Sequence, residues 1–311
     1  MLEPFVLPFR DDPEARLQLV QRTLQVGAGV WRQSLADYGR APELRAARAE
    51  QRLAAFARVF ASHCPHRAAL PDGAAAIACS ACAAGTLRPL LARDPGALVY
   101  GRCDGCGHGA LLRGAGIDPP ARSYAGAGYY ERRDGHGVGY DAYAREAAYR
   151  ERKGEQLVAR IARGLGAAPD CLLEVGSGYG YTRIAAERSG IRTHGVERNP
   201  HACEEARLRY GLPSFCGELA QALASPGSGI AEGGAAVVLY QYVLEHVRDV
   251  AAELRAAHRA LRARGALVLL VPSMDAAEID VFGASYRSFR ADHEHLFSRA
   301  SIAHVLRAAG F

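Results

Sequence analysis

The chain has 311 residues, of which 49% are hydrophobic and 23% are charged, and its formal net charge is +5. This composition excludes a mainly disordered chain and predicts a large core with smaller appended units. The basic residues are spread along the chain, which argues only weakly for nucleic-acid binding. The N-terminus lacks the pattern of a secretory signal, and the aliphatic run Ala266 to Val271 is too short to span a bilayer. We therefore expect a cytoplasmic protein without a membrane segment.

Residues 1–75 are predicted to form a helical N-terminal segment. Asp12-Pro13-Glu14 is typical of a helix start, because an acidic cap precedes a proline in the first turn. A second helix is predicted to begin near Pro42. Both have apolar residues at helical spacing, so we expect a hairpin over residues 10–62 that serves packing.

Residues 76–112 contain two Cys-x-x-Cys pairs, Cys79 with Cys82 and Cys103 with Cys106. Their spacing is typical of a zinc site with four thiolate ligands. Such a site has no open position for water, so its predicted role is structural. A glycine follows the second pair but not the first. The alternatives are that His108 replaces one cysteine, or that the cysteines are unpaired core residues.

Residues 113–148 form a predicted connector, or lid, that is rich in tyrosine. Most of these tyrosines are expected to serve packing. Tyr130 and Tyr140 are the candidates for lining a pocket, where their hydroxyl groups could contact a polar substrate.

From residue 149 onward, short apolar strands alternate with amphipathic helices. This pattern predicts an α/β fold in which a parallel sheet has helices on both faces. Asn199-Pro200 indicates a helix start, a helix from Asp249 is expected to end at Gly265, and the last helix covers about Arg299 to Ala309. The predicted strands are Cys171 to Val175, Arg192 to Glu197, Pro213 to Cys216, Ala235 to Gln241 and Gly265 to Pro272.

The first of these strands leads directly into Gly176, Gly178 and Gly180. Glycines let a backbone turn sharply and pass close to a ligand at a helix N-terminus. Glu174 precedes this loop, and Glu197 ends the next strand, where a carboxylate can accept the hydroxyls of a ribose. The Glu174 charge favours the cationic S-adenosylmethionine over the pyrophosphate of a dinucleotide. A dinucleotide site and a turn without a ligand are the alternatives.

Five segments, in order, resemble the class I methyltransferases, which implies a Rossmann-like parallel sheet. They are residues 172–180, 194–199, 242–247, 265–272 and 294–298. The resemblance implies that Glu174 and the glycines hold the methionine part, Glu197 the ribose, Glu218 the adenine, and Gln241 the floor below the sulfonium. The complete set of implied cofactor residues is Glu174, Gly176, Gly178, Tyr179, Gly180, Glu197, Arg198, Glu218 and Gln241.

Methyl transfer from a sulfonium needs a base when the attacking atom carries a proton. His246 follows the fourth strand and is the first candidate, because histidine titrates near neutral pH. The alternative is that Glu245 and His246 cap a helix or brace the loop. His295 is the second candidate, in a loop that could equally be solvated. Metal binding by residues 292–295 is disfavoured because adjacent side chains alternate in direction.

The cysteine pairs, the tyrosine-rich residues 124–131, residues 139–141 and the methyltransferase segments together resemble a zinc-containing family that includes sugar C-methyltransferases. This resemblance covers about residues 76–311. It implies C- or O-methylation of a small molecule, such as a nucleotide-linked sugar or a secondary metabolite. Methylation of RNA or protein and a non-catalytic binding scaffold are the alternatives.

The predicted methyltransferase domain, residues 149–311, ends at Gly310-Phe311. The class I sheet normally continues with two further strands after this helix. We therefore expect a truncated domain, whose unpaired edge strand lowers stability or promotes aggregation.

Overall fold

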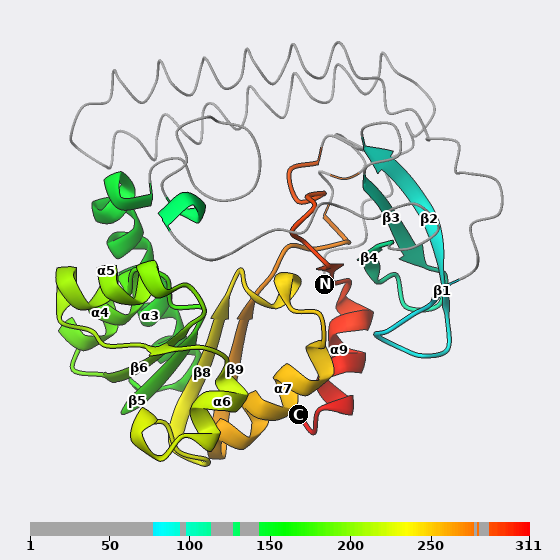
Figure 1. Cartoon of the computed structure of the whole chain (residues 1–311). Coiled ribbons are helices and arrows are strands. Elements are labelled where there is room, and N and C mark those ends of the chain that lie inside the picture. Colours follow the sequence, from blue (N-terminus) through cyan, green and yellow to red (C-terminus); the bar gives the residue numbers. More distant parts are fainter. Residues whose placement is uncertain (1–76, 94–97, 113–126, 131–142, 277–278, 280–285) are drawn as a thin grey trace.

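The structure is a computed structural model that describes residues 77–93, 98–112, 127–130, 143–276, 279 and 286–311 (Figure 1). The predicted hairpin at residues 10–62 and Tyr140 lie outside the described residues. Within these ranges the strands form two five-stranded sheets. None of the helices in the described ranges has the length and apolar character needed to cross a membrane.

The first sheet is parallel, and its strand order is β7-β6-β5-β8-β9. The structure confirms the predicted α/β fold, and three of the predicted strands have the observed bounds. The central strands β5 and β8 are buried, as is typical of parallel sheets, whereas β9 is only partly buried. The strands are β5 (Cys171–Val175), β6 (Arg192–Glu197), β7 (Phe215–Cys216), β8 (Ala235–Gln241) and β9 (Leu261–Leu270).

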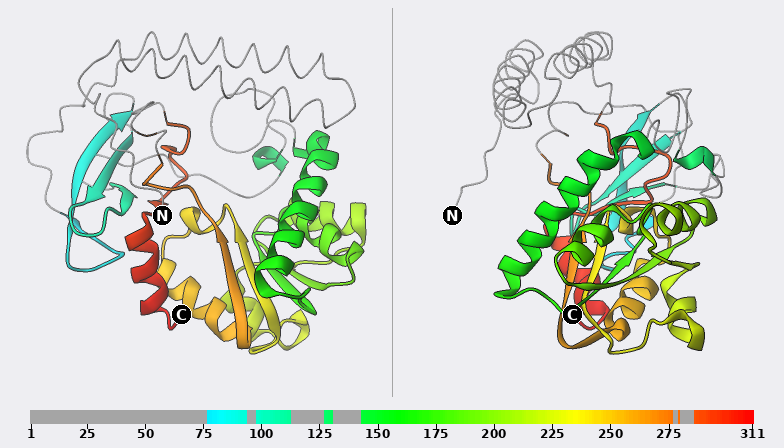
Figure 2. Two further views of the ribbon diagram at one scale, coloured as in Figure 1. Left: turned by 180° about the vertical axis from the view of Figure 1, so that it is seen from behind. Right: turned by 90° about the vertical axis from the view of Figure 1, so that its left-hand side faces the viewer.

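Helices cover both faces of this sheet (Figures 1 and 2). Leu172 of β5 packs in one cluster with α3 and α4, whereas Leu173 packs in another with α6 and α7. Successive residues of a strand point to opposite faces, so one strand contributes to both clusters. The helices of the domain are α3 (Ala147–Leu165), α4 (Tyr181–Arg188), α5 (Pro200–Tyr210), α6 (Leu219–Ala224) and α7 (Val250–Ala260).

The helix-start signals in this domain are confirmed, but one helix end is wrong. Asn199 caps α5 by accepting hydrogen bonds from the backbone N–H groups of His201 and Ala202. The helix predicted to run from Asp249 to Gly265 ends at Ala260. The backbone turns at Arg264, whose φ is 62°, and Leu261 already pairs with β8, so sheet pairing prevails over the helical pattern there.

The second sheet is antiparallel and combines the cysteine-bearing segment with the C-terminal part of the chain. It contains β1 (Ile77–Ala78), β2 (Thr86–Arg93), β3 (Leu98–Cys103), β4 (Gly109–Leu111) and β10 (His295–Leu296). The order is β1-β2-β3-β4-β10, with His295 opposite Ala110. Helix α9 (Arg299–Ala308) follows β10 directly. The two predicted units therefore share a sheet.

One hydrophobic cluster joins the cysteine-bearing segment to helices of the methyltransferase part. Leu87 and Val99 from the first lie in it with Leu254 of α7 and Val305 of α9. Figure 1 shows α9 between α7 and the strands β1 to β4. Four short 3-10 helices complete the described elements: η1 (Ala127–Tyr129), η2 (Tyr143–Glu146), η3 (Pro226–Ser228) and η4 (Leu244–His246).

Candidate active site

The glycine loop connects β5 to α4 at the carboxyl edge of the parallel sheet. Gly176 and Gly178 have φ values of 70° and 52°, in the left-handed region that residues with a Cβ avoid. A Cβ on Gly176 would lie 2.3 Å from Cγ2 of Val243, and one on Gly178 would lie 2.9 Å from the Tyr143 hydroxyl. The loop therefore needs glycine for its conformation and for space.

Glu197 ends β6 beside this loop, and its side chain is buried. Its Oε2 accepts a hydrogen bond from the Gly178 N–H at 2.8 Å, and its Oε1 accepts one from the Asn199 N–H at 2.8 Å. Burial raises the pKa of Glu197, and these hydrogen bonds oppose that effect. Glu197 also lines the cavity described below.

Tyrosines pack against the glycine loop. The Tyr130 ring lies 4.9 Å from the Tyr143 ring and 5.0 Å from the Tyr179 ring, measured between centroids. Hydrogen bonding of the Tyr130 side chain to Glu197 lowers the pKa of that carboxyl. Tyr130 lines the cavity described below, as predicted. Tyr179 is buried instead, with its hydroxyl 2.9 Å from His201 Nε2.

Glu174 is buried within β5, directly behind the loop. Its Oε2 has no hydrogen-bond partner among the described residues. Burial raises the pKa of Glu174 to about 8, and the nearby Arg183 partly offsets this. Glu174 is the residue predicted to hold the methionine part of the cofactor. It does not line the cavity described below, whereas its neighbours Val175 and Gly176 do.

A cavity of about 580 Å³ opens at this edge of the sheet. Its volume lies in the range typical of small-molecule sites. Glu218 and Arg198 line it and form an ion pair at 3.8 Å, and Gln241 lines it at the end of β8. Of the predicted cofactor residues, those that line the cavity are Gly176, Gly178, Glu197, Arg198, Glu218 and Gln241. Gly180 and Tyr179 shape the loop without forming part of this wall.

Acidic side chains dominate the charged lining of the cavity. Among the described residues, the two arginines in the lining are Arg198 and Arg248. The acidic residues are Glu197, Glu218, Asp249, Glu253, Asp292 and Glu294. Arg198 pairs with Glu218 and Arg290 with Asp292, and the remaining carboxylates favour a cationic ligand over a polyanion.

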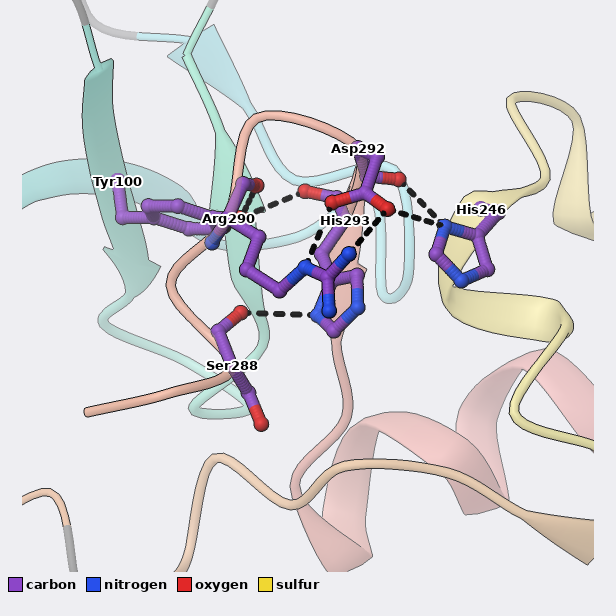
Figure 3. A network of polar contacts seen from close by, with 6 residues as sticks. All are labelled: Tyr100, His246, Ser288, Arg290, Asp292 and His293. Atoms are coloured by element: carbon purple, nitrogen blue, oxygen red, sulfur yellow. Dashed lines mark hydrogen bonds and ion pairs between the residues drawn. The ribbon is translucent and has the colours of Figure 1, made fainter. Parts of the chain in front are cut away.

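His246 lines the cavity, and Figure 3 shows its ring beside Asp292. Its Nδ1 lies 2.6 Å from the backbone oxygen of Asp292, so the Nδ1–H donates to this carbonyl. Burial lowers the pKa of His246, which keeps the ring neutral near neutral pH. A neutral ring with hydrogen on Nδ1 carries its lone pair on Nε2.

His295, the second predicted base, has a different environment from the one expected. It is buried in β10 rather than in a substrate-facing loop, with its Nδ1 3.1 Å from His108 Nε2. The cavity lining does not include His295 among the described residues. Pairing of β10 with β4 turns this side chain toward the cysteine-bearing segment.

Sequence reasoning did not connect Glu245 with His293. Both are buried beside His246, and one potential ligand atom from each of the three lies within 4.8 Å of the others. Burial raises the pKa of Glu245 to about 8 and lowers that of His293 to about 3. The buried Glu245 could not be recognised from the sequence, because the loop that covers it is distant along the chain.

The four predicted thiolates converge in the structure. Cys79 Sγ lies 3.7 Å from Cys106 Sγ, and Cys82 Sγ lies 3.7 Å from Cys103 Sγ. All four sulfurs are within 4.8 Å of one another. Tetrahedral zinc with bonds of about 2.3 Å would set sulfur separations of about 3.8 Å. His108 is excluded as a substitute ligand, because it contacts Ser301 and His295.

Both Cys-x-x-Cys pairs are followed by the same backbone turn. The Ala83 N–H bonds to the Cys79 oxygen at 3.0 Å, and the Gly107 N–H bonds to the Cys103 oxygen at 3.0 Å. Ala83 has a φ of 56°, close to the 70° of Gly107. The missing glycine after the first pair is therefore replaced by a strained alanine.

Solved structures that are similar to this chain include methyltransferases. A SAM-dependent methyltransferase from Archaeoglobus fulgidus is 15% identical, with a TM-score of 0.41, and the match covers 51% of this chain and 69% of that one. One from Thermotoga maritima is 23% identical, with a TM-score of 0.41 and coverages of 54% and 76%. The mitomycin 7-O-methyltransferase MmcR is 20% identical, with a TM-score of 0.39 and coverages of 52% and 48%. At these values the similarity says nothing of substrate.

No curated protein sequence matches this chain. A family model described as a methyltransferase domain matches residues 140–311. This match covers more than half of the chain and includes the glycine loop, Glu197 and His246. The chain therefore belongs to this methyltransferase-domain family.

Proposed function

We propose that this protein transfers a methyl group from S-adenosylmethionine to a small molecule. Family membership supports this methyl donor. The observation that carries the proposal is that Glu197, the glycine loop and His246 line the same cavity, with Glu197 hydrogen-bonded to the loop. This arrangement offers acceptors for a ribose and a neutral imidazole for a proton.

The acidic lining favours a small molecule over RNA. Proteins that bind RNA neutralise phosphates with lysine and arginine, and their affinity falls steeply with salt. The lining of this cavity has six carboxylate side chains and two arginines among the described residues. A sulfonium donor and a sugar or secondary metabolite suit this charge.

His246 is the candidate proton acceptor. Its Nδ1–H donates to the Asp292 carbonyl, so Nε2 is the nitrogen that can accept a proton from a hydroxyl or an acidic C–H group. Methylation at carbon or oxygen then requires the nucleophile, the methyl group and this nitrogen to meet in the cavity.

We also propose a structural zinc ion at Cys79, Cys82, Cys103 and Cys106. The two sulfur separations of 3.7 Å support it. Backbone N–H groups of Ala84 and Gly85 lower the pKa of the Cys82 thiol to about 7, whereas burial raises the pKa of the Cys79 and Cys106 thiols. Zinc binds deprotonated thiolates, so its charge would have to offset the effect of burial at those two residues. The shared sheet and hydrophobic cluster would let this ion stabilise β4 and β10.

Calorimetry with S-adenosylmethionine tests the cofactor assignment. The full chain should bind the cofactor, and Glu197→Ala should weaken binding at least tenfold because the ribose loses its acceptor. Glu204→Ala, in an exposed ion pair on α5, is the matched control and should bind normally. The absence of binding by the intact chain, or unchanged binding by Glu197→Ala, would refute the proposal.

A further inference from the structure

Two imidazoles and one carboxylate converge behind the cavity wall. His246 belongs to η4 and follows Glu245 directly, whereas His293 belongs to the loop before β10. The rings of His246 and His293 are 4.8 Å apart, measured between centroids, with an interplanar angle of 77°. One potential ligand atom from each residue lies within 4.8 Å of the other two.

Both imidazoles are held in the same tautomer by backbone carbonyls. His246 Nδ1 lies 2.6 Å from the Asp292 oxygen, and His293 Nδ1 lies 2.9 Å from the Ser288 oxygen (Figure 3). A carbonyl only accepts, so each Nδ1 carries the hydrogen and each Nε2 carries the lone pair. Histidine ligands of metals characteristically donate their second nitrogen to such a group, which fixes the ring orientation.

Glu245 supplies a buried carboxylate without a complete set of partners. Its exposed fraction is 1%, and its Oε2 has no hydrogen-bond partner among the described residues. A buried carboxylate oxygen without a partner has a high energetic cost in an apolar environment. A cation beside it would remove that cost.

Asp292 does not compete for the role of ligand. Arg290 binds its carboxylate through two hydrogen bonds, Nε to Oδ1 at 2.9 Å and Nη2 to Oδ2 at 3.1 Å (Figure 3). This pairing neutralises both side chains and fixes the backbone carbonyl that orients His246. Figure 3 shows the Arg290 guanidinium reaching Asp292, and Asp292 reaching His246.

We propose that Glu245, His246 and His293 bind a divalent transition-metal ion. Two histidines and one glutamate form a recognised zinc ligand set with an open fourth position. Around such an ion, bonds of about 2.1 Å place donor atoms about 3.4 Å apart. One ring nitrogen of each histidine and one carboxylate oxygen lie within 4.8 Å of one another in the structure, so rotations of these side chains would bring the donors to bonding distance.

Of the three ligands, His246 lines the cavity and Glu245 and His293 are buried behind it, so a substrate could reach the ion only at its open fourth position on the His246 side. This consequence rests on the proposed function. A hydroxyl oxygen that binds the ion loses its proton to water more readily. The oxygen would attack the methyl carbon, the carbon–sulfur bond would break, and S-adenosylhomocysteine would leave as a neutral thioether. His246 then acts as a ligand rather than as the proton acceptor, and hydroxyl or enol compounds are the expected substrates.

Zinc stoichiometry of the full chain tests the site. After equilibrium dialysis against Zn²⁺, we expect two zinc ions per wild-type chain, one at the four thiolates and one here. Glu245→Gln and His293→Asn should each bind one zinc ion. Glu232→Gln and His304→Asn, at exposed positions, are matched controls and should bind two. Glu245→Gln or His293→Asn chains that retain two ions would overturn the proposal.

Cobalt provides a readout that does not depend on a variant folding. Titration of the wild-type chain with Co²⁺ should give one equivalent with thiolate-to-metal absorption and a second without it. If the titration ends after one equivalent of Co²⁺, with only the thiolate-to-metal absorption present, the proposed metal site at Glu245, His246 and His293 is wrong. Calorimetry with S-adenosylmethionine on the same samples separates the two proposals, since a chain that binds two metal ions but no cofactor refutes only the proposed function.

Discussion

The Glu197 carboxylate accepts a hydrogen bond from the Gly178 N–H at 2.8 Å, which fixes the end of β6 to the glycine loop after β5. This hydrogen bond joins Glu197, which is predicted to bind the ribose, to the loop that is predicted to bind the methionine part. A change in the loop should therefore affect cofactor binding even without contacting the ribose.

Gly178→Ala should weaken S-adenosylmethionine binding about tenfold or more. The new Cβ would meet the Tyr143 hydroxyl at 2.9 Å, and a φ of 52° costs a residue with a side chain about 1–2 kcal/mol. Calorimetry measures the effect. Gly164→Ala, on α3 with open space around it, should bind normally and gain about 0.5–1 kcal/mol of stability. Equal cofactor affinity of both variants would contradict this prediction.

Glu174→Gln should stabilise the protein progressively as pH rises from about 4.5 to 8. Burial raises the Glu174 pKa to about 8, so the native state keeps a proton that the unfolded state releases. The free energy of unfolding of the wild type therefore falls through this window, by up to about 1.4 kcal/mol per pH unit for this group. Glutamine does not titrate. Urea unfolding of both proteins at pH 5.5 and 7.5 measures how much more stable the variant is than the wild type. If this difference in the free energy of unfolding is the same at both pH values, Glu174 is ionised in the folded protein.

Ala83→Gly should stabilise the cysteine-bearing segment. Ala83 has a φ of 56°, which costs about 1–2 kcal/mol for a residue with a Cβ, and glycine relieves it. The greater flexibility of glycine in the unfolded chain offsets about 0.4–1 kcal/mol. We expect a net gain of up to about 1 kcal/mol in the free energy of unfolding, with zinc stoichiometry unchanged. A loss of stability would mean that the observed turn is not the native one.

Gly85→Ala should abolish zinc binding at the four thiolates. A Cβ at this position would lie 2.4 Å from Cys103 Sγ and 3.0 Å from the Gly105 backbone nitrogen. Metal analysis should show one zinc ion fewer than in the wild type. Gly128→Ala, with no atom near the new Cβ, is the control and should leave the metal content unchanged.

The central sheet could be predicted because its strands are short apolar runs bounded by turns. Cys171–Val175, Arg192–Glu197 and Ala235–Gln241 were located to the residue. The glycine spacing and the acidic residue at the end of the next strand predicted the edge of the sheet at which the cavity opens. Those signals are local, so they are independent of the tertiary arrangement.

The parts that could not be predicted depend on contacts between distant segments. Nothing local to His295 indicates that it pairs opposite Ala110 and turns away from the cavity. Likewise, Glu245 and His293 come together only because the Glu294 N–H bonds to the Glu245 carbonyl at 2.7 Å and folds the loop over η4. Such pairings need the tertiary structure, since single-residue patterns do not encode them.

Transfer of a labelled methyl group tests the central claim most directly. The full chain is incubated with methyl-labelled S-adenosylmethionine and a cell extract, and the extract is then separated into small molecules, RNA and protein. We predict label in the small-molecule fraction, dependent on Glu197 and His246 and retained at high salt. Label confined to RNA or protein, or no label above that of a Glu197→Ala chain, would contradict the account.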